Sequence, residues 1–568
     1  MNSVLGVVGQ GRGADAVVAA LSDIEGSVEE LDDDAIDEAD FAVVIDEVGA
    51  PVFRRANRAG VPWIAVELGG VGGHAIAGVD AAISGFSPET ACFDCLRARV
   101  VSNREEEGES VEYDGVTERY AGAVAGREAA RLASGEESSL LGGVREIPHA
   151  ERRLLPIPGC PTCGESRDRT LGIAYEERTL DDAVSRAELA MDERIGIVRS
   201  LGEVSSFPVP YYLASTADTS GFSDARAAAQ SAGVSADWDE ALMKALGEGM
   251  ERYCAGIYRE EEFAVARPSE LGNAVSPAEF VCPTGWEDPS DEEIEWVSGR
   301  NLTTGDLVHL PAEFVHFPPP SMRFKPSITT GLGLGNSTVE ALLSGIYEVI
   351  ERDATMLAWY STFEPLGLAV EDEGFEALVK RARAEELEVT TLLVTQDIDV
   401  PVVAVAVHRE GEWPKFAVGS GANLDPDAAA RSALAEALQN WTELKLMGKE
   451  DAANEDGSIG RYAVFPDAAR EFVAPETTIP SSSVGSTVPE GVEELETVVS
   501  LARDAFQVYG ARLTTRDVAS LGFEGARVLV PDAQPLFTED AFFGERARTV
   551  PDELGFEPRL DREPHPYP

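Results

Sequence analysis

Three features of the sequence predict an α/β protein, with an α+β second part, that is organised in two domains. A strand, a glycine-rich turn and a helix open the chain, two C-x-x-C pairs follow, and one acidic helix pattern occurs twice further along. A length of 568 residues exceeds one hydrophobic core, and 44% hydrophobic residues suffice for two or three. We expect the first domain to span residues 1–168 and the second to span residues 169–568.

The opening segment predicts a Rossmann-like domain. Residues 3–8 have the composition of a buried strand, a tight glycine turn follows, and residues 14–21 continue as a helix. The turn is a weak nucleotide fingerprint, because Ala14 fills its last position and Asp46 follows much later than the roughly 20 residues usual for the ribose-binding acid. We interpret the turn as structural, with phosphate binding as the alternative.

Two cysteine pairs have the spacing of a metal site. Cys92 and Cys95 form one C-x-x-C, and Cys160 and Cys163 form the other. Two such pairs can close a tetrahedral site that leaves no coordination position open, so they predict structural Zn²⁺ and not a catalytic metal. Redox-active thiols are the alternative, and the presence of two matched pairs counts against them.

The most informative pattern is A-L-x-x-x-[LI]-x-E-x-x-E-R, which spans residues 241–252 and again residues 341–352. Its apolar positions have helical period, and its two Glu and its Arg share one helix face. Solvated ion pairs are the alternative in so acidic a chain, but a second copy in the same frame argues against chance. If the helices pack together, their carboxylates repel one another unless cations fill the cluster, and Mg²⁺ usually keeps phosphate oxygens as further ligands. The pattern therefore predicts a nucleotide site without a P-loop, formed by Glu248, Glu251, Arg252, Glu348, Glu351 and Arg352.

Two further segments belong with these helices. Residues 429–439 repeat the helical stripe and carry Glu436, while Asn336 and Glu340 lie at the start of the second acidic helix. In contrast, residues 454–494 show no sustained apolar period, and we predict a surface excursion or flexible loop there.

The charge of the chain argues against several functions. With 102 acidic and 46 basic residues, its net charge of −56 disfavours binding to nucleic acid or to anionic membranes. Lys occurs only at positions 244, 325, 380, 415, 445 and 449, and many carboxylates with so little Lys resemble the proteins of extremely halophilic archaea. No apolar run approaches the roughly 18 residues of a membrane span, and the first residues do not begin a signal peptide. We therefore expect a cytoplasmic protein.

Together these segments resemble the YcaO superfamily over residues 170–568. The acidic helices, Asn336 with Glu340, and Glu436-Ala-Leu-Gln439 occur in the order of that family, and residues 178–185 resemble its basic-x6-Ser segment. The resemblance implies that ATP or its metals contact Arg178, Ser185, Glu248, Glu251, Arg252, Asn336, Glu340, Glu348, Glu351, Arg352 and Glu436. It also implies that Mg²⁺ is held by Glu248, Glu251, Glu348, Glu351 and Glu436. The counterpart of the family's third-helix arginine stays open between Arg431 and Ser432.

The first domain resembles a truncated E1-like (ThiF-like) domain. The strand, glycine turn and helix carry the resemblance, together with Pro88-Glu-Thr-Ala-Cys92-x-x-Cys95-Leu-x-x-Arg99 and Cys160-x-x-Cys163. A complete adenylating loop is lacking, so the resemblance implies a scaffold or peptide-docking module. Fused E1-like and YcaO domains are typical of cyclodehydratases that make azole- or azoline-containing peptides.

The last five residues, Pro564-His565-Pro566-Tyr567-Pro568, match the P-x-P-x-P end of azoline-forming YcaO enzymes. The resemblance implies that the chain end reaches the active site, with the Pro568 carboxylate as general base, assisted by His565. An exposed tail residue is the alternative for His565. The implied activity is ATP-dependent cyclodehydration of Cys, Ser or Thr residues in a ribosomally made peptide to thiazoline or oxazoline, by phosphorylation of the backbone amide oxygen.

Two other functions fit part of the pattern. Backbone thioamidation would use the same ATP site with a sulfur donor, and a non-catalytic peptide-binding scaffold would need no ATP turnover. The tail counts against the first function, and the two acidic helices count against the second. The expected partners are the substrate peptide and, beyond it, a dehydrogenase or a peptide-recognition protein. The oligomeric state is left open, with a homodimer as one option.

Overall fold

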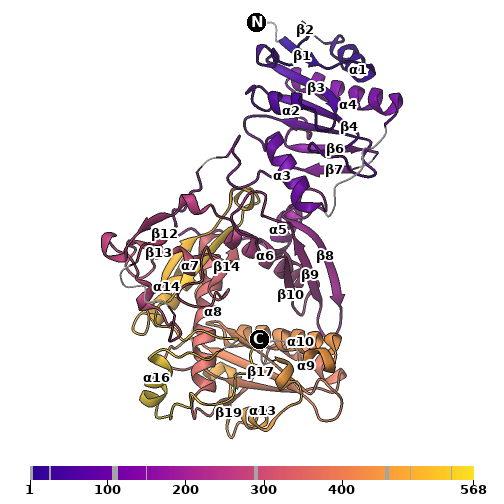
Figure 1. Ribbon diagram of the computed structural model, residues 1–568. Helices are drawn as coiled ribbons and strands as arrows, with labels where there is room; N and C mark the ends of the chain where they lie inside the picture. Colours follow the sequence, from indigo (N-terminus) through magenta and orange to yellow (C-terminus); the bar gives the residue numbers. More distant parts are fainter. Residues whose placement is uncertain are drawn as a thin grey trace.

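The computed structural model describes residues 4–24, 27–104, 113–148, 150–164, 166–286, 292–453, 459–485, 488–538 and 540–568. An N-terminal sheet with its helices lies at one end of the molecule, and the remaining sheets lie at the other end (Figure 1). The predicted mixed α/β class is confirmed, whereas the placement of the domain boundary at residue 168 stays a prediction.

The N-terminal sheet has the strand order β2-β1-β3-β4-β5-β6-β7. Its parallel half comprises β1 (Val4–Val8), β2 (Ser27–Glu30), β3 (Phe41–Glu47) and β4 (Trp63–Leu68). Its antiparallel half comprises β5 (Ala81–Phe86), β6 (Gly143–Ile147) and β7 (Ala150–Arg153). Helices α1 (Arg12–Leu21) and α4 (Gly115–Ala133) pack on one face, and α2 (Pro51–Ala56) and α3 (Phe93–Asn103) pack on the other. Because both faces are covered, the central strands are apolar at successive positions.

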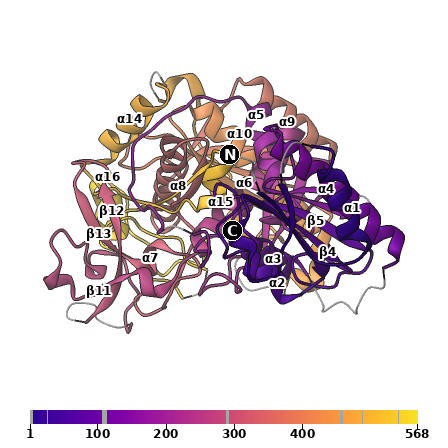
Figure 2. The same cartoon turned by 90° about the horizontal axis from the view of Figure 1, so that it is seen from above.

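The glycine turn before α1 is closed by the protein itself. Glu118, in the first turn of α4, accepts a hydrogen bond from the Gly13 backbone N at 3.1 Å. The two helices lie side by side in Figure 2, and a Cβ on Gly122 would lie only 2.2 Å from the Gly13 carbonyl oxygen. A carboxylate at a helix N-terminus occupies the position that a bound phosphate would need. The geometry therefore favours the structural interpretation of this turn.

The second part of the chain is built on further sheets. A small antiparallel sheet has the order β10-β9-β8, from β8 (Val198–Ser205), β9 (Tyr211–Thr216) and β10 (Gln230–Val234). A larger antiparallel sheet has the order β11-β12-β20-β21-β14, with β13 also paired to β12; its strands are β11 (Ala264–Ala266), β12 (Ile294–Asn301), β13 (Leu307–Pro311), β14 (Leu332–Gly335), β20 (Tyr509–Arg512) and β21 (Glu524–Leu529). The remaining sheet has the order β18-β17-β16-β15-β19, from β15 (Leu366–Ala369), β16 (Glu388–Leu393), β17 (Val402–His408), β18 (Phe416–Ala422) and β19 (Thr478–Pro480).

Helices connect and cover these sheets. They are α5 (Leu180–Ala187), α6 (Trp238–Gly256), α7 (Ala312–Val315), α8 (Thr338–Trp359), α9 (Glu373–Ala384), α10 (Pro426–Met447), α11 (Lys449–Ala452), α12 (Ile459–Tyr462), α13 (Asp467–Phe472), α14 (Val492–Ala502), α15 (Arg516–Ser520) and α16 (Arg546–Leu554). Short 3-10 helices occur at Ile36–Glu38, Glu188–Ala190, Glu260–Glu262, Pro268–Glu270, Pro277–Glu279 and Ser481–Ser483.

The helices α6, α8 and α10 lie at the junctions between sheets. Helix α6 packs on β10 and β14, α8 packs on β14, β21 and β18, and α10 packs on β18 and β17. Helix α8 thus links the larger antiparallel sheet to the β17 sheet, and the C-terminus of the chain lies beside α8 and α10 (Figure 1). These three helices carry the repeated acidic residues.

The prediction of a surface excursion or flexible loop over residues 454–494 is wrong where this segment forms helices and a strand. Residues 454–458 and 486–487 lie outside the described residues, but the rest contains α12, α13, β19 and the start of α14. Phe472 of α13 packs edge-on against Trp359 at a centroid distance of 5.4 Å, and β19 pairs with β15. Elements of three to six residues are too short to show a helical or strand period in the sequence.

Within the part of the chain that the structure describes, no helix is both long and apolar enough to cross a membrane.

Candidate active site

The predicted acidic helices are confirmed, and each starts at a capping side chain. Asp237, Ser337 and Asp425 accept hydrogen bonds from backbone N–H groups in the first turns of α6, α8 and α10. Such caps satisfy N–H groups that have no partner within a helix. They fix where each helix begins and therefore which positions face its sheet.

Each acidic helix also lies very close to one strand. A Cβ would lie 2.1 Å from Ala241 O at Gly233, 2.1 Å from Ala341 O at Gly333, and 2.4 Å from Ala433 O at Gly419. Any side chain at these positions would push the helix away from the strand. The glycines thus allow strand backbone to reach acids on the helix.

A backbone N–H holds one acid on each helix; Ala232 and Ser420 lie in strands, and Gly331 directly precedes β14. The N–H of Ala232 donates to Glu248 at 2.7 Å, the N–H of Gly331 donates to Glu348 at 3.0 Å, and the N–H of Ser420 donates to Glu436 at 2.6 Å. The structural repeat is therefore a strand, a glycine and a helix with a tethered acid. It includes the third helix, α10, which has only part of the sequence motif.

On α6, Arg252 bridges both acids of its motif. Its guanidinium lies 3.0 Å from Glu248 Oε1 and 3.1 Å from Glu251 Oε1. Burial raises the pKa of Glu251 to about 7; the charge of Arg252 opposes the shift, whereas the charges of Glu348 and Glu248 add to it. Glu348 of α8 is therefore close enough to Glu251 of α6 for its charge to act on it.

On α8, Arg352 gathers acids from two helices. It lies 3.5 Å from Glu351 Oε1 on its own helix and 3.9 Å from Glu436 Oε1 on α10. Ser420 donates its hydroxyl to Glu351 at 2.7 Å. Burial raises the pKa of Glu351 to about 7 and also raises the pKa of Glu436, because low polarity disfavours charge.

The predicted convergence of acids is thus present, but the acids do not enclose a single point. Among the described residues, the group whose ligand atoms all lie within 4.8 Å of one another is the cysteine set, not these carboxylates. Each acid is turned toward an arginine, a hydroxyl or a strand N–H. Carboxylates gathered from three helices fit the oxygen-ligand preference of Mg²⁺.

The residues predicted at the edge of the site divide into two groups. Glu340 accepts hydrogen bonds from Asn336 N at 2.8 Å and Asn336 Nδ2 at 3.0 Å, and Arg186 of α5 donates to Asn336 Oδ1. Arg178 instead pairs with Glu176 and Asp182, and Ser185 donates to Asp181 O, all within their own segment. Asn336 and Glu340 are thus held together at the start of α8, whereas Arg178 and Ser185 make their ion pairs and hydrogen bond within residues 176–185.

Arg431 does not reach the acids. Its guanidinium lies 2.7 Å from Asp372, the capping residue of α9. Of Arg431 and Ser432, the two candidates for the counterpart of the third-helix arginine, Arg431 therefore binds α9.

The C-terminal tail is docked and not frayed. Trp359 Nε1 donates to Glu563 O at 2.9 Å, Tyr462 donates to Pro564 O, and His565 Nε2 lies 2.7 Å from Phe537 O. His565 is 2% exposed, so the alternative of an exposed tail residue is wrong. Burial lowers the pKa of His565 to about 4, which leaves its imidazole neutral at pH 7 and weakly basic.

Tyr567 brings the end of the tail to the acids. Its ring is buried, and its pKa is raised mainly by burial and further by the charge of Glu351. Pro568 follows as an exposed residue. Sequence reasoning missed Tyr567 and Ser420 as site residues; the only signal for Ser420 was a run of small residues in a buried strand.

The four predicted zinc ligands come together. Sulfur distances are 3.6 Å for Cys92–Cys160, 3.4 Å for Cys95–Cys163 and 3.9 Å for Cys92–Cys95. A tetrahedral ion with bonds of about 2.3 Å places its sulfurs about 3.8 Å apart, so the set fits Zn²⁺. The Ile157 backbone N lies 3.4 Å from Cys95 Sγ and can donate to it.

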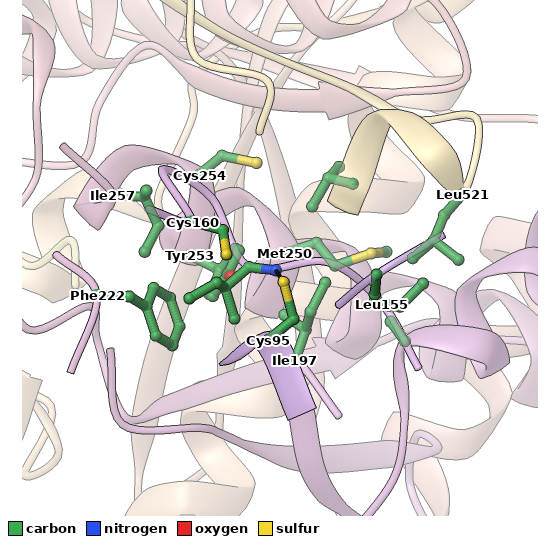
Figure 3. Packing of buried hydrophobic residues seen from close by; sticks show 14 of the residues in the cluster. Cys95, Leu155, Cys160, Ile197, Phe222, Met250, Tyr253, Cys254, Ile257 and Leu521 are labelled. Atoms are coloured by element: carbon green, nitrogen blue, oxygen red, sulfur yellow. Dashed lines mark hydrogen bonds between the residues drawn. The ribbon is translucent and has the colours of Figure 1, made fainter. Parts of the chain in front are cut away.

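This cluster lies at the contact with α6. The thiols of Cys95 and Cys160 belong to the same buried cluster as Met250 and Tyr253 of α6 (Figure 3). Arg99 of α3 makes a buried ion pair with Asp517 of α15, and Tyr253 donates to the same carboxylate at 2.6 Å. The N-terminal part is therefore anchored to the helix that carries Glu248 and Glu251.

Comparisons with known proteins agree with this geometry. The family model for YcaO cyclodehydratase, ATP- and Mg²⁺-binding, matches residues 232–534. An uncharacterised protein of Methanothermobacter thermautotrophicus is 30% identical over 339 residues, covering 56% of this chain and 85% of that protein.

Two solved structures show the same fold over nearly the whole chain. A heterocyclase in complex with substrate and cofactor has a TM-score of 0.76 at 21% identity, covering 100% of this chain and 86% of that one. The heterocyclase TruD has a TM-score of 0.68 at 19% identity, covering 98% of this chain and 82% of that one. With the three acidic helices inside a family match that spans more than half of its length, this chain belongs to the YcaO cyclodehydratase family.

Proposed function

We propose that this chain is an ATP-dependent cyclodehydratase that converts Cys, Ser or Thr residues of a ribosomally made peptide to thiazoline or oxazoline. The observation that supports the proposal most is the docking of the tail on α8, where Trp359 Nε1 donates to Glu563 O at 2.9 Å. The charges of Glu351 and Arg352 on the same helix act on the pKa of Tyr567. A bare ATPase site would not need a docked tail at the same place.

The proposed reaction removes one water from the peptide for each ATP. The substrate thiol or hydroxyl adds to the preceding carbonyl carbon and gives up its proton, and the former amide oxygen takes the γ-phosphoryl group as ADP leaves. The carbon–oxygen bond then breaks, inorganic phosphate departs, and the amide N–H proton is lost as the C=N bond of the ring forms. Phosphorylation matters because it turns an amide oxygen into a good leaving group.

The residues of the site have distinct proposed roles. The acids Glu248, Glu251, Glu348, Glu351 and Glu436 would hold Mg²⁺, which when bound offsets negative charge on the phosphates. Arg252 and Arg352 already lie among these acids and would offset phosphate charge directly. Asn336, Glu340, Arg178 and Ser185 stay proposed nucleotide contacts.

The tail supplies the proposed base. Where Pro568 ends the chain, its exposed carboxylate is the candidate to accept a proton, because it follows directly on Tyr567 at the acids. His565 is better suited to positioning than to proton transfer, since burial holds its pKa near 4.

For the first part of the chain we propose a zinc-stabilised, E1-like scaffold without adenylating activity. The thiol distances support Zn²⁺. Glu118 of α4 accepts a hydrogen bond from Gly13 N at the start of α1, which argues against a phosphate in the glycine turn. A scaffold of this kind could present the peptide; oxidation of the azoline ring would need a separate dehydrogenase.

The test is incubation of the full chain in high salt with a Cys/Ser/Thr-containing peptide, ATP and Mg²⁺, followed by mass spectrometry. We expect loss of one water per ring and one phosphate released per water lost. Exchange of oxygen for sulfur would indicate thioamidation, and an absence of peptide-dependent phosphate release would indicate a non-catalytic scaffold. The Glu351→Gln variant is the negative control.

A further inference from the structure

Arg352, which contacts acids of the site, also lines a small pocket. Its polar lining comes from Lys325, Thr330, Arg352, Arg527 and Gln534, and the rest of its wall is apolar. The cavity volume is about 40 Å³, and a buried water needs roughly 10–15 Å³ on this measure. The pocket can therefore hold a few waters or one small polyatomic ion, but not a nucleoside or a peptide ring.

Among the described residues, no carboxylate lies within ion-pair distance of the Lys325 ammonium. Its ammonium lies over the rings of Phe314 and Phe280, at 4.8 Å and 5.5 Å from their centroids. The nearby acid Glu313 instead accepts hydrogen bonds from Ser321 and from the backbone N–H groups of Arg323 and Phe324. Across the described residues, no ion pair links Lys325 to an acid, and burial lowers its pKa to about 8.

Arg527 adds a second buried charge. It is 3% exposed, and its two terminal nitrogens donate to Thr329 O and Ile328 O at 2.8 Å and 2.9 Å. Carbonyl oxygens orient the guanidinium without neutralising it, and its Nε is buried with no hydrogen-bond partner in the described structure. Glu348 is the acid that acts on it most, from the side of the carboxylate cluster.

The positive charge of Lys325 and Arg527 at one pocket is unusual for so acidic a chain. The sequence has 102 acids for 46 basic residues, so a carboxylate is available for nearly every cation. Placing the half-buried Lys325 and the buried Arg527 at one pocket, without an ion pair from either to a described acid, is unfavourable unless an anion offsets their charge. The small volume limits that anion to one about the size of phosphate.

We propose that the pocket lined by Lys325, Arg352 and Arg527 binds a tetrahedral oxyanion of the inorganic phosphate class. Arg352 lines this pocket and also contacts Glu351 and Glu436, so an anion here would lie next to the acids that are proposed to hold Mg²⁺. In the reaction proposed above, and resting on it, the pocket receives the phosphate that leaves the ring carbon.

Calorimetric titration of the full chain with inorganic phosphate, in high salt without ATP or Mg²⁺, tests the binding site. We expect one saturable site, at least about tenfold weaker binding in Lys325→Met, and near-normal binding in Lys325→Arg, which keeps the charge. Lys380→Met is the matched control, because Lys380 is exposed and pairs with Glu376 on α9. Methionine suits the aromatic walls, and circular dichroism checks the fold of each variant.

The outcomes separate this proposal from the proposed function. Absence of phosphate binding in the wild-type chain, or wild-type affinity in Lys325→Met, would overturn the pocket assignment even if cyclisation occurs. Phosphate binding that depends on Lys325, in a chain that does not cyclise peptides, would uphold the pocket and remove only its role in the reaction. In an active enzyme, we expect product inhibition by phosphate to weaken in Lys325→Met more than ATP affinity does.

Discussion

The cysteine cluster and the carboxylate cluster both gather metal-ligating side chains, but they do so in different ways. The four sulfurs already lie within 4.8 Å of one another. The five acids on α6, α8 and α10 are instead divided among Arg252, Arg352, the Ser420 hydroxyl and strand N–H groups. The first cluster is closed, whereas the second is held open by partners that a ligand can replace.

The difference follows from the chemistry of the ligands. Neutral thiols pack like small apolar side chains and do not repel one another, so a protein core can bring them together. Buried carboxylates do repel, and the pKa values of Glu251 and Glu351 are raised mainly by burial and further by the neighbouring carboxylates. A site for a permanent ion can therefore be assembled in advance, whereas a site for Mg²⁺ and nucleotide is completed by its own ligands.

Removing an acid should have the largest effect on activity. We expect Glu248→Ala and Glu351→Ala each to lower ATP turnover by about 1000-fold or more, because each would remove a charge that positions Mg²⁺ at the phosphates. The melting temperature should stay within about 3 °C of the wild type, since each change also relieves carboxylate repulsion. Glu376→Ala, an exposed acid on α9, is the control for charge. Normal turnover in both variants, measured in high salt, would contradict the metal-site assignment.

Breaking the cysteine cluster should act on stability first. We expect Cys160→Ser to lose about one zinc per chain and to lower the melting temperature by about 10 °C, because a site with three thiolates binds the ion weakly. Metal analysis and calorimetry measure the two effects. Cys282→Ser is the matched control, since Cys282 is a half-buried thiol outside the cluster. Unchanged zinc content or unchanged melting in Cys160→Ser would show that the cluster is not a structural zinc site.

Deleting residues 564–568 should separate ring formation from nucleotide binding. We expect azoline yield to fall about 100-fold, the typical contribution of a general base, while nucleotide affinity changes less than about threefold. Peptide mass spectrometry and a fluorescent nucleotide analogue report the two quantities. His565→Ala in the full-length chain should give a smaller loss, because it loosens the tail at Phe537 without removing its end. An unchanged azoline yield after the deletion would refute the role of the tail.

Local spacing explains which parts of this comparison could be predicted from the sequence. The cysteine pairs and the E-x-x-E-R helices depend on residues three or four apart, and helix geometry alone places such residues on one face. The strand glycines could not be predicted, because Gly233, Gly333 and Gly419 are three of 53 glycines and only the fold shows which lie under a helix.

Residues that meet only through tertiary packing were also missed. Lys325 and Arg527 come from separate segments and share a pocket only because β21 lies next to β14 and α8. His565 was assigned an exposed alternative because proline-rich ends usually fray, but Phe537 and Tyr462 bury this one. Sequence pattern identified the acids, their two arginines and the thiols; it could not identify the backbone N–H groups and the Ser420 hydroxyl that also hold the acids in place.

The smallest expected effect tests the idea that the carboxylate cluster is held open by exchangeable partners. Ser420 donates its hydroxyl to Glu351 at 2.7 Å, and its backbone N–H donates to Glu436 at 2.6 Å. Ser420→Ala removes only the first bond, which is worth about 1 kcal/mol and which the ion would otherwise have to displace. The Mg²⁺ concentration needed for half-maximal turnover should therefore fall about fivefold with little change in kcat. Zinc content and melting temperature should not change, because the cysteine cluster is built independently. Loss of turnover as complete as in Glu351→Ala would instead make the hydroxyl an essential ligand. An unaltered or raised Mg²⁺ requirement would mean that the ion does not replace the hydroxyl at Glu351.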